Sequence, residues 1–229
     1  MSDTEVPSLS IIIPTLNEAG RLGPVLDALT PAPGDDIIIA DGGSSDNTDE
    51  IAAAHNTRFV VTLAGRGRQL ATGAEAATGE WLLFAHADTR LSKGWRDVAF
   101  DFMTTPKNSH RAAVFKFRLD DDAPPARRLE KIVAWRNRTF GLPYGDQALL
   151  ISRVFYRELG GFKELPLMED VDMIRRIGGH RITFLDAEAV TSADRYKKGG
   201  YFLRPLRNLV CLALYFGGLP PHTIERLYR

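Results

Sequence analysis

The first ninety residues alternate short apolar runs with amphipathic segments, each bounded by Gly, Pro, Ser or Asn. The predicted strands are 9–13, 36–40, 58–62 and 81–85, and the predicted helices are 21–29, 48–55 and 68–78. Near-continuous apolar strands such as SIIIP and DIIIAD are typical of parallel strands buried on both faces. The pattern therefore predicts an α/β fold with a Rossmann-like, mostly parallel sheet, helices on both faces, and ligands at the carboxyl ends of the strands.

The second half is less regular. It predicts strands at 112–119, 148–152 and 181–185 and helices at about 127–140 and 170–177. Segment 120–125 has three aspartates and two prolines, which indicates a solvated loop or a flexible flap. We expect one domain at 1–198, with a donor-binding part at about 1–90 and an acceptor part at about 91–198, followed by a C-terminal helical tail at 199–229.

Charge and cysteine content exclude several classes of protein. Lys plus Arg and Asp plus Glu each total 29, so the balance gives no reason to expect a nucleic-acid partner. The single Cys211 excludes an intrachain disulfide and a cysteine-based zinc site. The start MSDTEVPSLS lacks a signal-peptide pattern, and the apolar stretch 206–219 is shorter than the roughly 20 residues of a membrane span, so we expect a cytoplasmic location.

Four polar groups follow the four predicted strands of the first half. They are PTLNE at 14–18, DGGSSD at 41–46, GRGR at 65–68 and HAD at 86–88. Because the carboxyl ends of parallel strands share one edge of a sheet, we expect these groups to converge.

The last three of these groups each have a ligand-binding interpretation and a structural one. Asp41 is placed to accept hydrogen bonds from a nucleoside, while a helix cap accounts for the residues that follow it. Arg66 and Arg68 suit a diphosphate, but they also fit a basic surface turn. Asp88 can hold a divalent cation shared with a diphosphate, or it can cap the next turn.

A fifth acidic group, MEDVD, lies at the start of a predicted helix. Carboxylates at a helix amino terminus are favoured by the helix dipole, which is the structural interpretation. The apolar approach at 166–168 can also desolvate Glu169 or Asp170 and raise its pKa enough for it to act as a base.

The motifs IIIPTLNE, ADGGSSDNT, HADT, GGF and MEDVD occur in this order, and with them the chain resembles family 2 glycosyltransferases of the GT-A fold over nearly its whole length. The fuller set GRGRQLATGA, LLFAHADTRL, YGDQALLISR, LPLMEDVDM and TSADRYKKGG is similar to the radical SAM/selenodomain-associated transferases, a subgroup related to arsenosugar-biosynthesis proteins. The resemblance implies inverting transfer of a sugar from a nucleotide-diphospho-sugar, with a metal on the leaving diphosphate.

The resemblance also implies roles for individual residues. Pro14, Thr15 and Glu18 match the strand end that lies against the nucleoside, and Asp41 and Gly43 match the second strand end. Asp88 matches the last acid of the metal triplet, and Asp170, with Glu169 beside it, matches the acidic pair that supplies the base. Asp88, Glu169 and Asp170 complete the site that the resemblance implies.

The chain departs from the family pattern at two positions. Gly42 replaces a second acid that contacts uracil in many relatives, so the nucleotide stays open. His86 replaces the first acid of the metal triplet. Imidazole suits transition metals better than Mg²⁺. We therefore expect either Mn²⁺ or Mg²⁺, bound by Asp88 alone or by Asp88 together with His86. The Gln-x-x-Arg-Trp pattern of processive synthases is absent, which favours addition of a single sugar.

Several alternatives stay open at this point. The chain is also compatible with a sugar nucleotidyltransferase, or with a nucleotide-sugar-binding protein that has lost catalysis. The acceptor is an unidentified small molecule or lipid. The apolar segment 201–216, with Lys197, Lys198, Arg204 and Arg207 facing headgroups, can lie on a membrane surface, pack on the catalytic domain, or form a homodimer.

Overall fold

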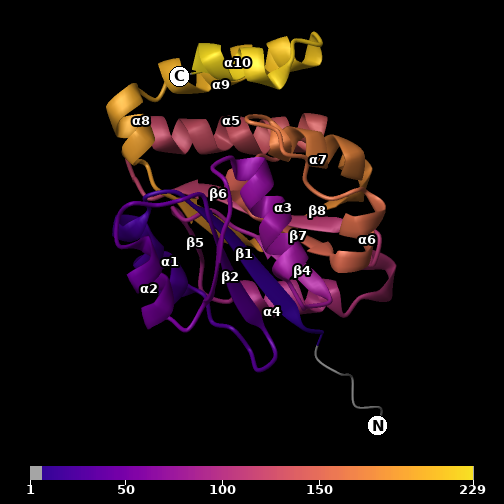
Figure 1. Ribbon diagram of the computed structural model, residues 1–229. Helices are drawn as coiled ribbons and strands as arrows, with labels where there is room; N and C mark the ends of the chain where they lie inside the picture. The colour runs from indigo at the N-terminus through magenta and orange to yellow at the C-terminus, as the bar shows by residue number, and fades with distance from the viewer. Residues whose placement is uncertain (1–6, 229) are drawn as a thin grey trace.

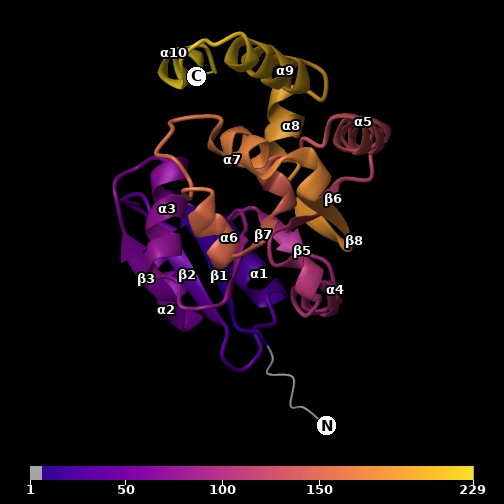
Figure 2. The same ribbon diagram turned by 90° about the vertical axis from the view of Figure 1, so that its right-hand side faces the viewer.

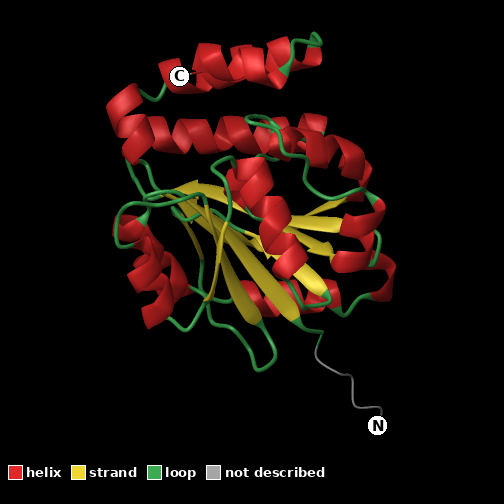
Figure 3. Cartoon of the chain, in the orientation of Figure 1, coloured by secondary structure: helices red, strands yellow, loops and turns green. Residues whose placement is uncertain are grey.

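The computed structural model describes residues 7–228, and within them one mixed sheet lies between layers of helices (Figures 1 and 3). The strands are β1 (Leu9–Thr15), β2 (Asp36–Asp41), β3 (Arg58–Val61), β4 (Trp81–Phe84), β5 (Thr89–Leu91), β6 (Ala112–Leu119), β7 (Leu149–Ser152) and β8 (Ile182–Thr191). The helices are α1 (Ala19–Ala28), α2 (Thr48–Ala54), α3 (Arg66–Ala76), α4 (Trp95–Met103), α5 (Pro124–Phe140), α6 (Arg153–Glu158), α7 (Glu169–Ile177), α8 (Asp194–Gly199), α9 (Leu203–Phe216) and α10 (Pro221–Tyr228).

The strand order is β3-β2-β1-β4-β7-β6-β8-β5. The first four strands pair in parallel, and Ile12 lies between Ile38 and Phe84. The predicted βαβαβαβ unit is therefore confirmed. In the second half, β7 is antiparallel to both of its neighbours, and β5 is antiparallel to β8.

The side-chain alternation of β1 divides the core into two layers. Ile11 and Ile13 face one side and pack with residues of α1, α2 and α4. Ile12 faces the other side and packs with residues of α3, α6 and α7. Because successive side chains of a strand point to opposite faces, one continuous apolar run supplies both layers.

Some predicted boundaries were wrong. Helix α3 begins at Arg66 rather than 68, and β8 continues to Thr191 rather than ending at 185. Strand β5 and helices α4, α6 and α8 were not predicted. Helix α5 begins at Pro124 rather than at about 127, so both prolines of the predicted 120–125 loop lie in its first turn. The remaining loop is tied to its surroundings, because Asp120 accepts a hydrogen bond of 2.7 Å from the amide of Ala193.

The tail lies across the carboxyl edge of the sheet, above α7 (Figures 1 and 2). Cys211, Leu212 and Ile224 of the tail are buried against Met168 and Val171. Within residues 7–228 no helix is long and apolar enough to cross a membrane. Residues 1–6, which begin the segment without a signal-peptide pattern, lie outside the described part.

Candidate active site

Two adjoining cavities open at the carboxyl edge of the sheet. The larger, here called the rim cavity, has a volume of about 640 Å³ and is lined by residues that follow β1, β3 and β4. The smaller, the inner cavity, has a volume of about 130 Å³ and lies beneath α8 and α9. The two share Arg66, His86, Asp88 and Arg195 as a common wall.

Most of the predicted site residues lie at this edge. The rim cavity is lined by Pro14, Thr15, Glu18, Arg66, Arg68, His86 and Asp88. Asp170 lines the inner cavity. Asp41 and Gly43 line neither cavity. Glu169 also lines neither cavity and is buried in the protein interior.

Asp41 organises the loop after β2. Its carboxylate accepts hydrogen bonds from Thr15 Oγ1 (2.9 Å), the amides of Gly43 (2.8 Å) and Ser44 (2.7 Å), and Ser44 Oγ (2.5 Å). Burial acts to raise the pKa of Asp41, but the hydrogen bonds from Ser44, Thr15 and Gly43 hold this pKa below its ordinary value. In this arrangement the acid is a brace that fixes Thr15 at the edge of the rim cavity.

The side chain of Gln69 gives a physical reason why position 42 holds a glycine rather than an acid. The Gln69 side chain is buried, and its amide donates to the carbonyls of Thr15 (2.6 Å) and Ala40 (3.0 Å). A Cβ at position 42 would lie 3.1 Å from Gln69 Nε2 and 3.2 Å from Ala64 Cα, so a larger side chain there requires these neighbours to shift by a few tenths of an ångström. Gln69 thus takes the space that an acid at position 42 would need.

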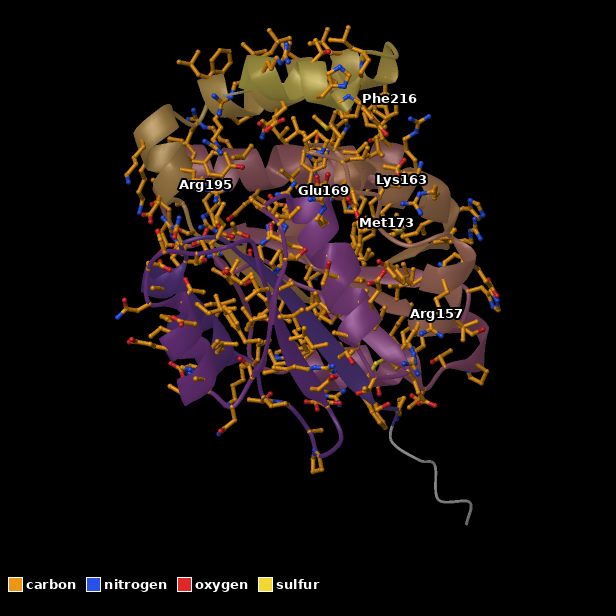
Figure 4. The ribbon with its side chains drawn as sticks, viewed as in Figure 1. Arg157, Lys163, Glu169, Met173, Arg195 and Phe216 are labelled. Carbon is orange, nitrogen blue, oxygen red and sulfur yellow. The ribbon has the colours of Figure 1, made fainter. Side chains whose placement is uncertain are left out.

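Arg66 links the two cavities to the MEDVD segment. Its Nε donates to Glu169, which is 1% exposed, and its Nη2 lies 4.0 Å from Asp170 Oδ2. Burial raises the pKa of Glu169, against the opposing effect of Arg66. Glu169, labelled in Figure 4, therefore holds the guanidinium in place, whereas Asp170 lines the inner cavity.

Asp170 is oriented by backbone groups. Its Oδ2 accepts from the amide of Gly145 at 2.9 Å and its Oδ1 from the amide of Val171 at 2.8 Å. Met168, two residues earlier, has a φ of 67°, a left-handed conformation that is uncommon for a non-glycine residue. Such strained backbone clusters at functional sites, where the surrounding structure over-determines it.

His86, Asp88 and Arg195 form the rest of the common wall. Burial and Arg66 lower the pKa of His86 to about 4, so its imidazole is neutral near pH 7. Arg195 Nη2 lies 3.9 Å from Asp88 Oδ2 and 4.0 Å from Glu18 Oε1. Arg195 therefore bridges the strand ends of β1 and β4 from the tail side (Figure 4).

Asp88 and His86 fit a metal ion whose coordination is completed by oxygen atoms of a bound ligand and of water. Among residues 7–228 no three His, Cys, Asp or Glu side chains converge on one point, so the protein alone does not form a closed metal cage. One carboxylate with a neutral imidazole beside it leaves most coordination positions for phosphate oxygens and water, as is common for hard cations at diphosphate sites. The basic residues Arg66, Arg68 and Arg195 line the same cavity.

Comparison with known proteins identifies the family. The profile described as glycosyl transferase family 2 matches residues 10–147, which include the strand ends of β1, β2 and β4. The chain belongs to glycosyl transferase family 2. A glycosyltransferase of PGL/p-HBAD biosynthesis from Mycobacterium bovis is 39% identical over 94 residues, and the match spans 37% of each chain.

Solved structures show the same fold. The mannosyltransferase PcManGT from Pyrobaculum calidifontis, in complex with GDP-Man and Mn²⁺, has a TM-score of 0.67 at 20% identity, covering 90% of this chain and 63% of that one. Glucosyl-3-phosphoglycerate synthase from Mycobacterium tuberculosis, with Mn²⁺, UDP and glucosyl-3-phosphoglycerate, has a TM-score of 0.60 at 18% identity, covering 93% and 81%. The GT-A glycosyltransferase fold expected from the motifs is thereby confirmed for this family 2 member.

The sequence analysis missed one acidic residue of the site. Asp146, in the 3₁₀ turn Gly145–Gln147, lines the inner cavity, and its Oδ1 is buried without a hydrogen-bond partner. Burial raises the pKa of Asp146 to about 6. The sequence alone shows Asp146 as part of a polar pair in a loop, because only the tertiary fold brings it to the cavity of Asp170.

Proposed function

We propose that this family 2 protein transfers a single sugar, with inversion, from a nucleotide-diphospho-sugar to an acceptor bound in the inner cavity. The observation that carries the proposal is the arrangement of two cavities that share one charged wall. The rim cavity has the size and the cations for a sugar nucleotide, and Asp170 lies only on the inner side. A donor and an acceptor bound in this way would meet at the common wall.

The residues of the rim cavity have distinct roles in this proposal. Pro14, Thr15 and Glu18 lie against the nucleoside, with Asp41 and Gly43 supporting the loop behind them. The guanidiniums of Arg66, Arg68 and Arg195 neutralise the diphosphate, a task that suits their fixed fork of donors. Because Arg66 is held by Glu169, its position is fixed before the donor binds.

A divalent metal fits beside Asp88 and His86. When bound, such an ion supplies charge neutralisation for the leaving diphosphate. The neutral imidazole of His86 favours Mn²⁺ over Mg²⁺. The Mn²⁺ in the structures of similar fold supports this assignment, and the common wall supplies the oxygen and nitrogen ligands.

Asp170 acts as the general base. In the transfer, the acceptor oxygen forms a bond to the anomeric carbon, the bond from that carbon to the diphosphate oxygen breaks, and the acceptor proton passes to Asp170. A single displacement of this kind inverts the anomeric centre. Asp146, in the same cavity, is placed to orient the acceptor hydroxyl by accepting a hydrogen bond.

The motif set that includes GRGRQLATGA and TSADRYKKGG supports assignment to the radical SAM/selenodomain-associated subgroup. The cytoplasmic location stays a prediction. The domain boundary at residue 198 also stays a prediction. The acceptor is a small molecule or a lipid. The structure gives no reason to prefer a nucleotidyltransferase, because the loop directly after β1 is not Gly-rich, and Gly20, Arg21 and Gly23 lie in helix α1. Diphosphate release from a nucleoside triphosphate and a sugar phosphate is the activity that would favour this alternative.

A calorimetric screen of UDP, GDP, CDP and ADP, each with Mn²⁺, with Mg²⁺ and without metal, tests the donor site. Selective binding to the folded state must raise its apparent stability. We expect one base-selective response that a metal strengthens. No response to any nucleotide would contradict the proposal, and tight donor binding without turnover across many acceptors would favour the non-catalytic alternative.

A further inference from the structure

The outer face of α9 is apolar along its whole length. Five large side chains of this helix are between 44% and 67% exposed, namely Leu203, Leu206, Leu209, Val210 and Phe216. They recur at spacings of three and four residues, with exposed Ala213 between them, so they form one stripe. Phe202, immediately before the helix, is 76% exposed. Helix α9, which carries this stripe, lies in the layer that caps the molecule in Figures 1 and 2.

The opposite face of α9 contacts the catalytic site. Arg204 and Asn208 line the inner cavity, and Cys211 and Leu212 are buried in the core. The expectation that Arg204 faces lipid headgroups was therefore wrong, because this side chain lies on the protein side of the helix. The two faces of α9 thus differ, with Arg204 and Asn208 turned toward the cavity and the apolar stripe turned outward.

Charge around the stripe is strongly one-sided. From the start of α8, residues 194–228 contain six Lys or Arg residues and two acids, Asp194 and Glu225, although the whole chain is neutral. Arg195 and Arg204 line the cavities, and Asp194 pairs with Arg21 at 3.5 Å. Lys197 and Lys198 are exposed on α8, directly before the stripe, and Arg226 is exposed on α10. Glu225 lines the rim cavity instead of the outer surface.

We propose that the outer face of α9 docks on an anionic lipid bilayer. An apolar stripe about 21 Å long, from 14 residues at about 1.5 Å each, can lie in the plane of the interface with its side chains in the acyl boundary. The lysines of α8 then meet acidic headgroups, which adds electrostatic attraction. The docked helix contacts lipid on one side and the inner cavity on the other.

The charge pattern disfavours a second copy as the occupant. Pairing of two copies through α9 brings Lys197, Lys198 and Arg226 of both copies together, whereas the acids of this region are engaged elsewhere, Asp194 with Arg21 and Glu225 at the rim cavity. An anionic bilayer supplies that compensation. The inference goes beyond the proposed function and does not depend on which residue is the base.

Co-sedimentation with vesicles tests the proposal. We expect the wild-type protein to pellet with vesicles of equal parts phosphatidylglycerol and phosphatidylcholine at low salt, and less with pure phosphatidylcholine. Val210→Glu should reduce the partition coefficient at least about tenfold, because a charge enters the stripe. Val154→Glu, the same change at an exposed position of α6, is the matched control and should bind like wild type.

Three results would overturn the proposal. They are failure of the wild type to pellet with the anionic vesicles, equal binding by Val210→Glu and wild type, and a concentration-dependent dimer that Val210→Glu abolishes in light scattering. Nucleotide binding, measured in parallel on each variant, shows that the protein is folded and separates this test from the donor screen. If the wild-type protein binds nucleotide but does not pellet with the anionic vesicles, the docking surface is refuted and the proposed donor site is not.

Discussion

Gly145 both holds Asp170 and leaves room for it. The Gly145 amide donates to Asp170 Oδ2 at 2.9 Å, and a Cβ at position 145 would lie 3.3 Å from the same oxygen and 2.8 Å from His86 Nε2. The backbone therefore approaches Asp170 and His86 so closely that a Cβ at position 145 requires one of these side chains to shift. This relationship joins the loop before β7 to the strand end of β4 and the start of α7.

Gly145→Ala is accordingly expected to damage catalysis. The added methyl must displace His86 or Asp170, and a misplacement of about 1 Å at a reacting group costs roughly a hundredfold in rate. We expect kcat/KM to fall by about that factor in a sugar-transfer assay. Gly20→Ala, where a Cβ meets nothing within 4 Å, is the control and should keep wild-type activity. Equal activity of the two variants would refute the role assigned to Gly145.

Asp146→Asn tests the residue that the sequence did not reveal. If Asp146 orients the acceptor hydroxyl, the amide should lower kcat/KM for the acceptor about tenfold or more and leave nucleotide affinity unchanged. Steady-state kinetics with the acceptor varied, beside calorimetry with the nucleotide, separates the two effects. Unchanged acceptor kinetics would exclude Asp146 from acceptor binding.

The regular half of the fold was predictable because its signals are local. Parallel strands buried on both faces leave continuous apolar runs, and Gly, Pro and Asn mark their ends. Strand β8 was underestimated because its buried positions after Leu185 are small alanines, Ala187 and Ala189, that alternate with Asp186 and Glu188. Strand β5 is three residues long and owes its conformation to pairing with β8, which no local pattern can show.

The candidate site was predictable to the extent that its residues follow strands. His86 and Asp88 come directly after β4, so their place at the rim follows from topology. The meeting of Asp170 with Gly145, and of Arg195 with Asp88, depends on loops whose paths are set by tertiary packing. Asp41 shows the reverse case, because its carboxylate follows a strand as a ligand-binding residue would, yet it accepts hydrogen bonds from Thr15 of β1 and from Gly43 and Ser44 of its own loop.

Asp41 should give the protein a stability that depends on pH. Its pKa is lower in the folded state than the ordinary value of 3.8, so its contribution is present above about pH 4 and is lost as pH falls through the folded-state value. Asp41→Asn should cost roughly 2 kcal/mol in the free energy of unfolding at pH 7. The difference from wild type should shrink below pH 4 in denaturant titrations. Asp49→Asn, at an exposed position, should cost little at any pH.

Asp88→Ala should remove the response to metal. We expect the enhancement of nucleotide binding by Mn²⁺ to fall at least about tenfold, since the variant loses the carboxylate ligand. Isothermal calorimetry with and without Mn²⁺ measures this directly. Asp186→Ala, which removes an 87% exposed carboxylate away from both cavities, controls for the change in net charge. Enhancement by Mn²⁺ that survives in Asp88→Ala would disprove the assignment.

The most direct test of the central claim is sugar transfer by Asp170→Asn, measured together with nucleotide affinity. If Asp170 is the base, turnover should fall at least about a hundredfold while the nucleotide binds as in wild type. Asp172→Asn is the matched control from the same helix, because Asp172 pairs with Lys163 at 3.0 Å outside both cavities and its loss should affect stability more than turnover. Near wild-type turnover by Asp170→Asn would contradict the account.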